Sequence, residues 1–391
     1  MSSASELFAE VRTIAEQAGI EQALARLADH FRDRRMHHEL FEVLKMNVRH
    51  GLGIPLLYGE SADDLDEAGR RRLEDGLLEA CREVGTMLVE DGQLHEGWVY
   101  IQPVGDRELS RNLITSVPVT DENIDALVEI AFSGGAAPDF GYDLVLKKYG
   151  TCNAITTIDT RGAQFDAPTR RQIAAMLVNH LYDELCANVC SHIEQEKGEG
   201  TVAEGASLRE LMAAHPWITA GGSHHVDATH LASVMRIGLV VEDGVALKRL
   251  VELAAYGASL ASDFQYAGNP PFENTYPDSQ IYYRALLGEK VDEAVAHFDR
   301  KAKETDRGRH GSIAIDTLID LLKRVGRRQQ ALDIAFDQLE SDETTTTANV
   351  HELAESGPEM DSVMKFFQQR NDLLGYSVGL LRKLDAGENG S

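Results

Sequence analysis

The sequence of 391 residues is poor in basic residues. It has 38 Lys and Arg against 64 Asp and Glu, which gives a formal net charge of −26. Proteins that bind nucleic acid neutralise its phosphates with clustered Lys and Arg, so this balance excludes nucleic acid as a general partner. An acidic, well-solvated surface is the simplest explanation of the charge.

Long apolar runs are missing too. No stretch approaches the roughly 18 apolar residues of a membrane span, so no membrane partner is predicted. The N-terminal stretch MSSASELFAEVRTIAEQ lacks the basic start and apolar core of a signal peptide. Cysteine is scarce and scattered, which is typical of reduced thiols: Cys81, Cys152, Cys186 and Cys190. These absences predict a cytoplasmic protein.

The motifs of several common enzyme families are absent. The chain has no GxxxxGK[ST] phosphate loop, no glycine fingerprint after a clear strand, no GxSxG and no CxxC. The sequence therefore gives no support to a nucleotide cofactor, to α/β-hydrolase chemistry or to a zinc ribbon.

Apolar residues at helical spacing are abundant. Leu77, Val84 and Leu88 belong to one stripe, which ends at Asp91-Gly92 before a second short helical pattern begins. The same order of helix, glycine turn and helix recurs near the C-terminus, around Gly288 and Gly326. This repetition, with no sign of βαβ alternation, predicts an all-α fold built from antiparallel helix hairpins.

These hairpins resemble tetratricopeptide repeats. The segment GRRQQALDIAF from Gly326 looks like the turn and second helix of such a repeat, and GEKVDEAVAHF from Gly288 and GQLHEGW from Gly92 are similar. The resemblance covers about half of the chain, without a strict period of about 34 residues. It implies hairpins stacked as a right-handed α-solenoid, a fold that commonly binds peptides in its concave groove.

One helical domain is predicted for residues 1–385, followed by a disordered tail. Its parts are N-terminal hairpins (1–133), an irregular central part with the candidate site (134–280) and tetratricopeptide-like hairpins (281–385), and the tail is 386–391. Strand is expected only as a short extended piece at 154–158, where the β-branched Thr156, Thr157 and Ile158 follow one another. Ser207 and Glu210 form the pattern of a helix capping box.

The stretch 217–231, WITAGGSHHVDATHL, concentrates more candidate ligands than any other window. If Asp227 is the N-cap of a helix, His230 lies in its first turn and faces the same end as His225. Two imidazoles and a carboxylate at a helix start could hold zinc, manganese or iron. The alternative is that Asp227 only caps the helix and the histidines are surface or core residues.

A second candidate is the polar stripe on the long helix that begins near Pro168. His180, Glu184, Asn188 and His192 follow one another at intervals of four, roughly 100° around the axis from the apolar stripe. At this edge of the buried face, His180 and Glu184 could share a metal or act as a base and its orienting group. The alternative is a solvated helical His–Glu pair.

The proline-rich segment 269–278 is predicted to be a stiff loop that holds side chains in place. Tyr276 in this loop and Tyr282 beyond it could bind a polar substrate or move a proton. They could equally anchor the loop by packing.

The interruptions of the helical pattern bracket all these candidates, which favours an enzyme over a plain scaffold. The predicted enzyme is a metal-dependent hydrolase, lyase or isomerase acting on a small polar substrate, neutral or cationic. Its divalent ion would be held by histidines and a carboxylate, with His225, His230, Asp227 and His180 as the candidate ligands. The groups that would move the proton are Glu184, Tyr276 and Tyr282. The alternative is a tetratricopeptide-like scaffold that binds a peptide without catalysis, and association into a homo-oligomer is open in both cases.

Overall fold

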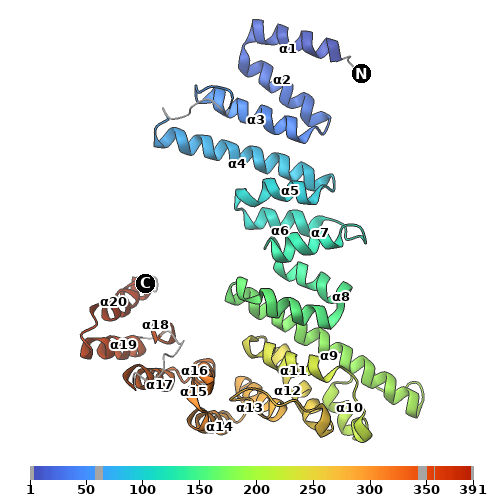
Figure 1. Cartoon of the computed structure of the whole chain (residues 1–391), viewed down its shortest axis with the longest axis vertical. Coiled ribbons are helices and arrows are strands. Elements are labelled where there is room, and N and C mark those ends of the chain that lie inside the picture. The colour runs from blue at the N-terminus through green and yellow to red at the C-terminus, as the bar shows by residue number, and fades with distance from the viewer. Residues whose placement is uncertain (1–3, 58–64, 342–349, 356, 389–391) are drawn as a thin grey trace. The chain divides into compact units, whose positions relative to one another are not determined.

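The computed structural model describes residues 4–57, 65–341, 350–355 and 357–388 (Figure 1). Within these ranges the regular structure is helical, and the only β-type contact is an isolated bridge between Ala267 and Asn274. The predicted all-α class is therefore confirmed. None of the described helices combines the length and the apolarity that are needed to cross a membrane.

The chain divides into two compact units, residues 1–150 and 151–391. The division falls at Gly150, inside helix α8 (Pro138–Arg161), where φ is 75° and ψ is 179°. Glycine alone adopts this conformation readily, and it interrupts the helix. The division lies within the part 134–280 that the sequence predicts as irregular.

The first unit consists of α-helices ahead of α8: α1 (Ala4–Ala18), α2 (Ile20–Asp33), α3 (His37–Gly51), α4 (Glu67–Glu90), α5 (Leu94–Ile101), α6 (Arg107–Ser116) and α7 (Ile124–Val128). Their apolar stripes face one another. Leu24 of α2, Leu40 of α3 and Leu88 of α4 are buried in one core. A second core forms around Leu127 and Ile130. Burial of these stripes provides the main driving force for packing the helices.

After α8 the second unit continues with α9 (Ala167–Lys197), α10 (Leu208–Ala214), α11 (Ala228–Ile237), α12 (Gly244–Ser259), α13 (Thr275–Leu286), α14 (Val291–Glu304), α15 (Arg307–His310), α16 (Ile313–Arg324), α17 (Arg328–Ser341), α18 (Val350–Leu353), α19 (Gly357–Gln369) and α20 (Leu373–Glu388). Short 3₁₀ or π turns also occur in the chain: η1 (Gln102–Val104), η2 (Glu129–Ser133), η3 (Gly162–Gln164), η4 (Ala220–Gly222), η5 (Gly238–Val240) and η6 (Ser262–Phe264).

Helix α9 is the scaffold of the candidate site. Asp166 caps its N-terminus by accepting a hydrogen bond from the backbone N–H of Thr169 at 2.9 Å. Its predicted apolar stripe, which includes Leu177, Leu181 and Leu185, is fully buried, and the helix packs against α11 and α12. The polar stripe therefore lies at the edge of a buried face, as the sequence predicts.

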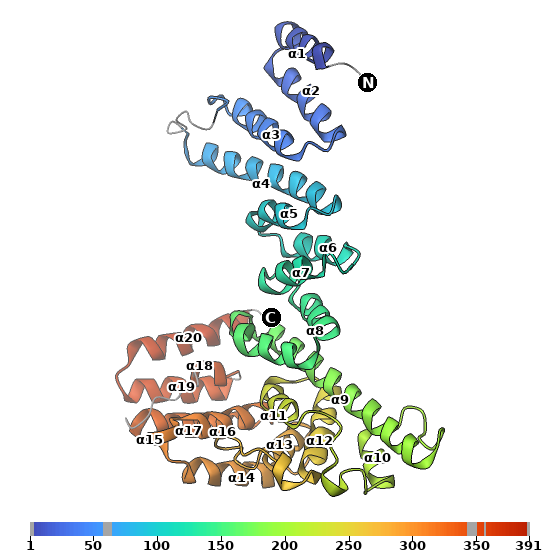
Figure 2. The same cartoon turned by 45° about the vertical axis from the view of Figure 1, so that its right-hand side comes forward.

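The predicted glycine-turned hairpins are present in the C-terminal part. Gly288 separates α13 from α14 and Gly326 separates α16 from α17, with φ values of 80° and 79°. These left-handed conformations favour glycine because a Cβ atom would be strained there. α16 packs against α17, and α19 packs against α20 (Figure 2). The right-handed solenoid that the resemblance implies stays a prediction.

Two local predictions are wrong. Residues 154–158 belong to helix α8 and not to an extended segment. Thr156 and Thr157 fit into the helix because each hydroxyl donates to the carbonyl four residues earlier, at 3.0 and 2.7 Å. The proline-rich loop is also shorter than predicted, because residues 275–278 already form the first turn of α13. Of the predicted tail, residues 386–388 end α20 and residues 389–391 lie outside the described ranges.

Candidate functional site

Asp227 begins helix α11 as predicted. Its Oδ1 atom accepts hydrogen bonds from the hydroxyl and the backbone N–H of Thr229, at 2.6 and 2.7 Å. These bonds hold the pKa of the Asp227 carboxyl below its usual range, with the hydroxyl of Thr229 as the largest cause. Gly221 and Gly222 ahead of the helix have φ values of 66° and 85°, so glycine is favoured in the turn that leads to the histidines.

The polar stripe of α9 faces this turn. The side-chain amide of Asn188 donates to the carbonyl of His225 at 2.8 Å, and Nδ1 of His192 lies 2.8 Å from Nε2 of His225. Two successive members of the stripe therefore hold the backbone and the ring of His225. The rings of His192 and Trp217 also form a T-shaped pair, with ring centroids 5.2 Å apart.

Tyr256 of α12 fixes the other side of the His225 ring. Its hydroxyl oxygen lies 2.9 Å from the backbone nitrogen of His225 and 2.8 Å from Nδ1 of the same residue. The oxygen accepts the backbone N–H, so the proton of the fully buried hydroxyl is donated to Nδ1. His225 then carries its own proton on Nε2 and donates it to Nδ1 of His192. The result is a directed chain of hydrogen bonds, Tyr256 to His225 to His192.

Burial keeps the first two members of this chain, Tyr256 and His225, neutral. Burial, followed by the nearby His192 and His224, lowers the pKa of His225 to about 4. Burial raises the pKa of the Tyr256 hydroxyl to about 12. At neutral pH the imidazole is therefore uncharged and the phenol keeps its proton, so the hydrogen-bond directions are fixed.

His225 lines an open hollow of about 620 Å³, and a predicted catalytic group, Glu184, lines the same hollow. The hydroxyl of Thr151 donates to Oε2 of Glu184 at 2.9 Å, which fixes one carboxylate oxygen. The rest of the wall combines acidic, imidazole, aromatic and apolar groups: His224, Val226, Asp227, Ala228, Thr229, Phe264 and Tyr266. Hollows with carboxylates and aromatic rings suit a polar ligand with an apolar face.

The other predicted ligands are not brought to this hollow. His180 and His230 are half-buried, and neither belongs to its wall. Asp227 has extended backbone angles, φ −60° and ψ 123°, so the chain at His225 leaves the direction of the α11 axis. Among the residues that the structure describes, no three His, Cys, Asp or Glu side chains are grouped so that they could hold a metal ion. A zinc, manganese or iron site at His225, His230, Asp227 and His180 thus stays a prediction without an assembled ligand set.

The two predicted catalytic tyrosines are buried anchors. The hydroxyl of Tyr276 donates to the carbonyl of Ala228 at 3.4 Å, and that of Tyr282 donates to Oδ2 of Asp320 at 2.7 Å. Each side chain is only 1% exposed. Burial raises the pKa of Tyr276 to about 12 and raises that of Tyr282 well above its usual value. Neither hydroxyl lines the His225 hollow.

Two members of the site, Tyr256 and Thr151, have no signal in the sequence. Tyr256 lies on a helix that is otherwise apolar at this end, 31 residues beyond its partner His225. His192 had a signal, because it continues the polar stripe of α9 at the spacing of four. Thr151, the partner of Glu184, is 33 residues away from it, and nothing near it marks it as part of the site.

Comparison with protein-family models gives no match for this chain, and comparison with curated proteins gives none either. No relative therefore adds support to the tetratricopeptide resemblance, and the function has to be inferred from the residues of the hollow.

Proposed function

We propose that the chain is an isomerase or lyase that moves a proton on a small polar carbonyl compound. The observation that carries this proposal is that a carboxylate, Glu184, and a neutral imidazole, His225, line one hollow. A carboxylate base opposite a neutral histidine that donates a hydrogen bond is a known arrangement for isomerising hydroxy-carbonyl compounds.

Glu184 is the base in this proposal. Because Thr151 holds Oε2, the second oxygen is left to take a proton from the carbon next to the substrate carbonyl. The electron pair of the broken C–H bond forms a C=C bond, and the π pair of the carbonyl moves to its oxygen. In an isomerisation the proton of the neighbouring hydroxyl passes to that oxygen, Glu184 returns its proton to the former carbonyl carbon, and the carbonyl re-forms at the neighbouring carbon. In an elimination the pair on the oxygen re-forms the carbonyl, the C=C pair shifts to the next carbon, and the leaving group departs with its bonding pair and takes the proton from Glu184.

His225 stabilises the oxygen that gains charge. Its Nε2–H group donates to His192 in the structure, and a substrate oxygen beside Glu184 would take the place of His192 as acceptor. Tyr256 holds the ring in the tautomer that carries this proton. We do not assign hydrolysis, because an imidazole with a pKa of about 4 is a weak base for activating water.

The charges of the wall support a neutral or cationic substrate. Two carboxyl groups, Glu184 and Asp227, line the hollow, and the pKa of Asp227 is lowered below its usual value. A polyanion would be repelled by these carboxylates. The proposed steps do not require the zinc, manganese or iron predicted from the histidines.

Deuterium exchange tests the proposal without knowledge of the product. In D₂O the wild-type protein is expected to exchange the carbon-bound protons next to the carbonyl of hydroxyacetone, glycolaldehyde or dihydroxyacetone. Proton NMR measures the exchange rate from the loss of the corresponding signals. Glu184→Gln should lower the rate about 10²- to 10⁴-fold, because it removes the base. Asp183→Asn, a neighbouring acid on α9 outside the hollow, should leave the rate unchanged. Wild-type exchange no faster than in buffer for all three compounds would contradict the proposal.

A peptide-binding scaffold is the second candidate. The hairpins α13–α14 and α16–α17, with their glycine turns, favour it because they are the segments that resemble tetratricopeptide repeats. Such a protein needs no neutral histidine beside a carboxylate. Absence of exchange together with capture of a peptide by the C-terminal hairpins would select this alternative.

The cysteines support the proposal that the protein works in the cytoplasm. All four are free thiols, including Cys186 and Cys190, which lie one turn apart on α9. Burial raises the pKa of Cys186 to about 11, so this thiol stays protonated and unreactive. Unpaired cysteines of this kind are typical of a reducing compartment.

A further inference from the structure

Beside the His225 hollow lies a second cavity, a cleft of about 340 Å³. Helices α11, α13 and α16 and the segment 266–272 form its walls. Six of the larger side chains that line it are apolar: Met235, Leu239, Pro270, Pro271, Phe272 and Ile313. Its volume lies within the range of small-molecule sites.

Ser279 marks this cleft as a place for a ligand. The residue is only 2% exposed and lines the cleft. A hydroxyl in the wall of a mainly apolar cleft can donate or accept one hydrogen bond with a ligand. The cleft therefore fits a molecule that is mainly apolar and carries one hydrogen-bonding group.

The charge of the cleft points to an uncharged ligand. Arg236 is the one charged residue in the wall, and both oxygens of Asp159 accept hydrogen bonds from its guanidinium, at 2.9 and 2.8 Å. This pairing offsets the positive charge at the rim. A carboxylate or phosphate on the ligand would have to compete with Asp159 for the guanidinium.

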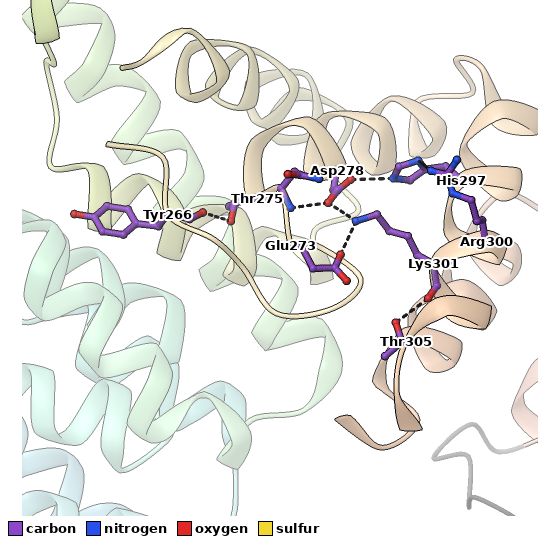
Figure 3. A network of polar contacts seen from close by, with 9 residues as sticks. Tyr266, Glu273, Thr275, Asp278, His297, Arg300, Lys301 and Thr305 are labelled. Atoms are coloured by element: carbon purple, nitrogen blue, oxygen red, sulfur yellow. Dashed lines mark hydrogen bonds and ion pairs between the residues drawn. The ribbon is translucent and has the colours of Figure 1, made fainter. Parts of the chain in front are cut away.

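A polar network holds the chain directly after the wall segment 266–272 (Figure 3). Lys301 of α14 donates to Asp278 at 2.6 Å and to Glu273 at 2.5 Å, while His297 lies 2.9 Å from the second oxygen of Asp278. The hydroxyl of Thr275 donates to the carbonyl of Tyr266 at 2.7 Å. The cleft wall is therefore preformed, which lowers the entropy cost of binding.

Tyr266 joins the cleft to the proposed active site, because it lines both the cleft and the His225 hollow. We infer that the two cavities bind one amphiphilic substrate: its hydroxy-carbonyl part lies at Glu184 and His225, and its uncharged aromatic or alkyl part lies in the cleft against Ser279. This inference rests on the proposed function for the reacting part of the molecule. Binding in the cleft itself does not depend on it.

Fluorine NMR with 4-fluorobenzyl alcohol tests the cleft separately from catalysis. This probe is neutral, aromatic and carries one hydroxyl, and a fragment of its size binds in about the millimolar range. Ala232→Trp on α11 and Thr317→Trp on α16 fill the cleft from opposite walls and should each raise Kd at least about tenfold. Ser279→Ala should raise it about three- to tenfold through the lost hydrogen bond.

Two control variants should bind the probe as the wild type does. Val245→Trp places the same bulky side chain at an exposed position of the second unit outside the cleft. His225→Gln alters the proposed active site and leaves the cleft intact. Unchanged Kd in both cleft-filling variants, or no binding to the wild type, would overturn the cleft site whatever the catalytic result.

Exchange in D₂O tests whether one substrate uses both cavities. The wild type should exchange 2-hydroxyacetophenone with a kcat/KM at least about tenfold above that of hydroxyacetone, because the phenyl group is buried in the cleft. Ala232→Trp should abolish this preference and leave the rate for hydroxyacetone unchanged. If Ala232→Trp lowers kcat/KM equally for both compounds, or keeps the preference for 2-hydroxyacetophenone, the inference that one substrate binds in both cavities is wrong. Exchange of neither compound, with intact probe binding, would reject the proposed function and the bridging substrate and leave the cleft as a binding site.

Discussion

At the scale of single residues, His225 shows how burial sets chemistry. Its pKa in the folded protein is about 4, below the usual 6.5, because burial and the neighbouring His192 and His224 disfavour the imidazolium. Between these two values the unfolded chain binds more protons than the folded one. Folding stability contributed by His225 is therefore complete above about pH 6.5 and is lost as the pH falls toward 4.

Urea unfolding at pH 7.5 and pH 4.5 checks this expectation. Between these values the wild type should lose about 1–2 kcal/mol more stability than His225→Gln, a figure reduced from the full shift because the ring is only half-buried. The other histidines are the same in both proteins, so the difference isolates His225. An identical pH dependence in the two proteins would show that the ring is not held neutral by folding.

The sequence identified the residues of the site that stand in local patterns. Glu184 and His192 were visible as a stripe at intervals of four, and His225 stood beside the helix cap at Asp227. The sequence could not show which rings converge, because the extended backbone at Asp227 separates the direction of His225 from that of His230. The role of Tyr256 could not be predicted from the sequence, because its hydrogen bonds depend on how α12 packs near the turn before α11.

At the scale of elements, the residue types at helix N-termini were better predictors than the residue types inside helices. The capping box of Ser207 and Glu210 forms as expected, because each side chain bonds a backbone N–H only three residues away. The segment 154–158 was misjudged because β propensity is weak against helical context. Its threonines lose little in the helix, since their hydroxyls find carbonyls in the preceding turn.

The approach of α12 to α13 depends on Gly257. A Cβ atom at this position would lie 2.3 Å from Cδ1 of the buried Tyr276. Gly257→Ala should therefore destabilise the second unit by about 1–3 kcal/mol, because either the ring or one of the helices has to move. Gly244→Ala at the start of α12 is the matched control, since its Cβ meets nothing within 4 Å. It should be neutral or slightly stabilising.

Fluorescence can follow the second unit alone in this comparison. The chain has two tryptophans, Trp98 in the first unit and Trp217 in the second, so a Trp98→Phe background leaves one reporter. Urea unfolding of both glycine variants in this background gives the two changes in stability. Equal stability of Gly257→Ala and Gly244→Ala would contradict the close contact of α12 and α13.

At the scale of the whole molecule, both cavities belong to the second unit. Every residue that lines the His225 hollow or the cleft lies between 184 and 317, and Thr151 adds the partner of Glu184. The unit begins where Gly150 already interrupts α8. A chain that starts at residue 151 therefore removes no residue of either site and cuts no continuous helix.

The fragment 151–391 should consequently fold by itself. We expect it to unfold cooperatively, to be mainly helical by circular dichroism and to bind 4-fluorobenzyl alcohol with a Kd within about twofold of the full chain. A fragment that starts at residue 168 is the control: it lacks Asp166, which caps α9, Asp159, which neutralises Arg236, and Thr151. Loss of the cap and of these partners should lower its melting temperature by several degrees, since a cap alone contributes about 1 kcal/mol. A fragment 151–391 that is unfolded, or that is no more stable than the shorter one, would show that residues 1–150 are needed to complete the second unit.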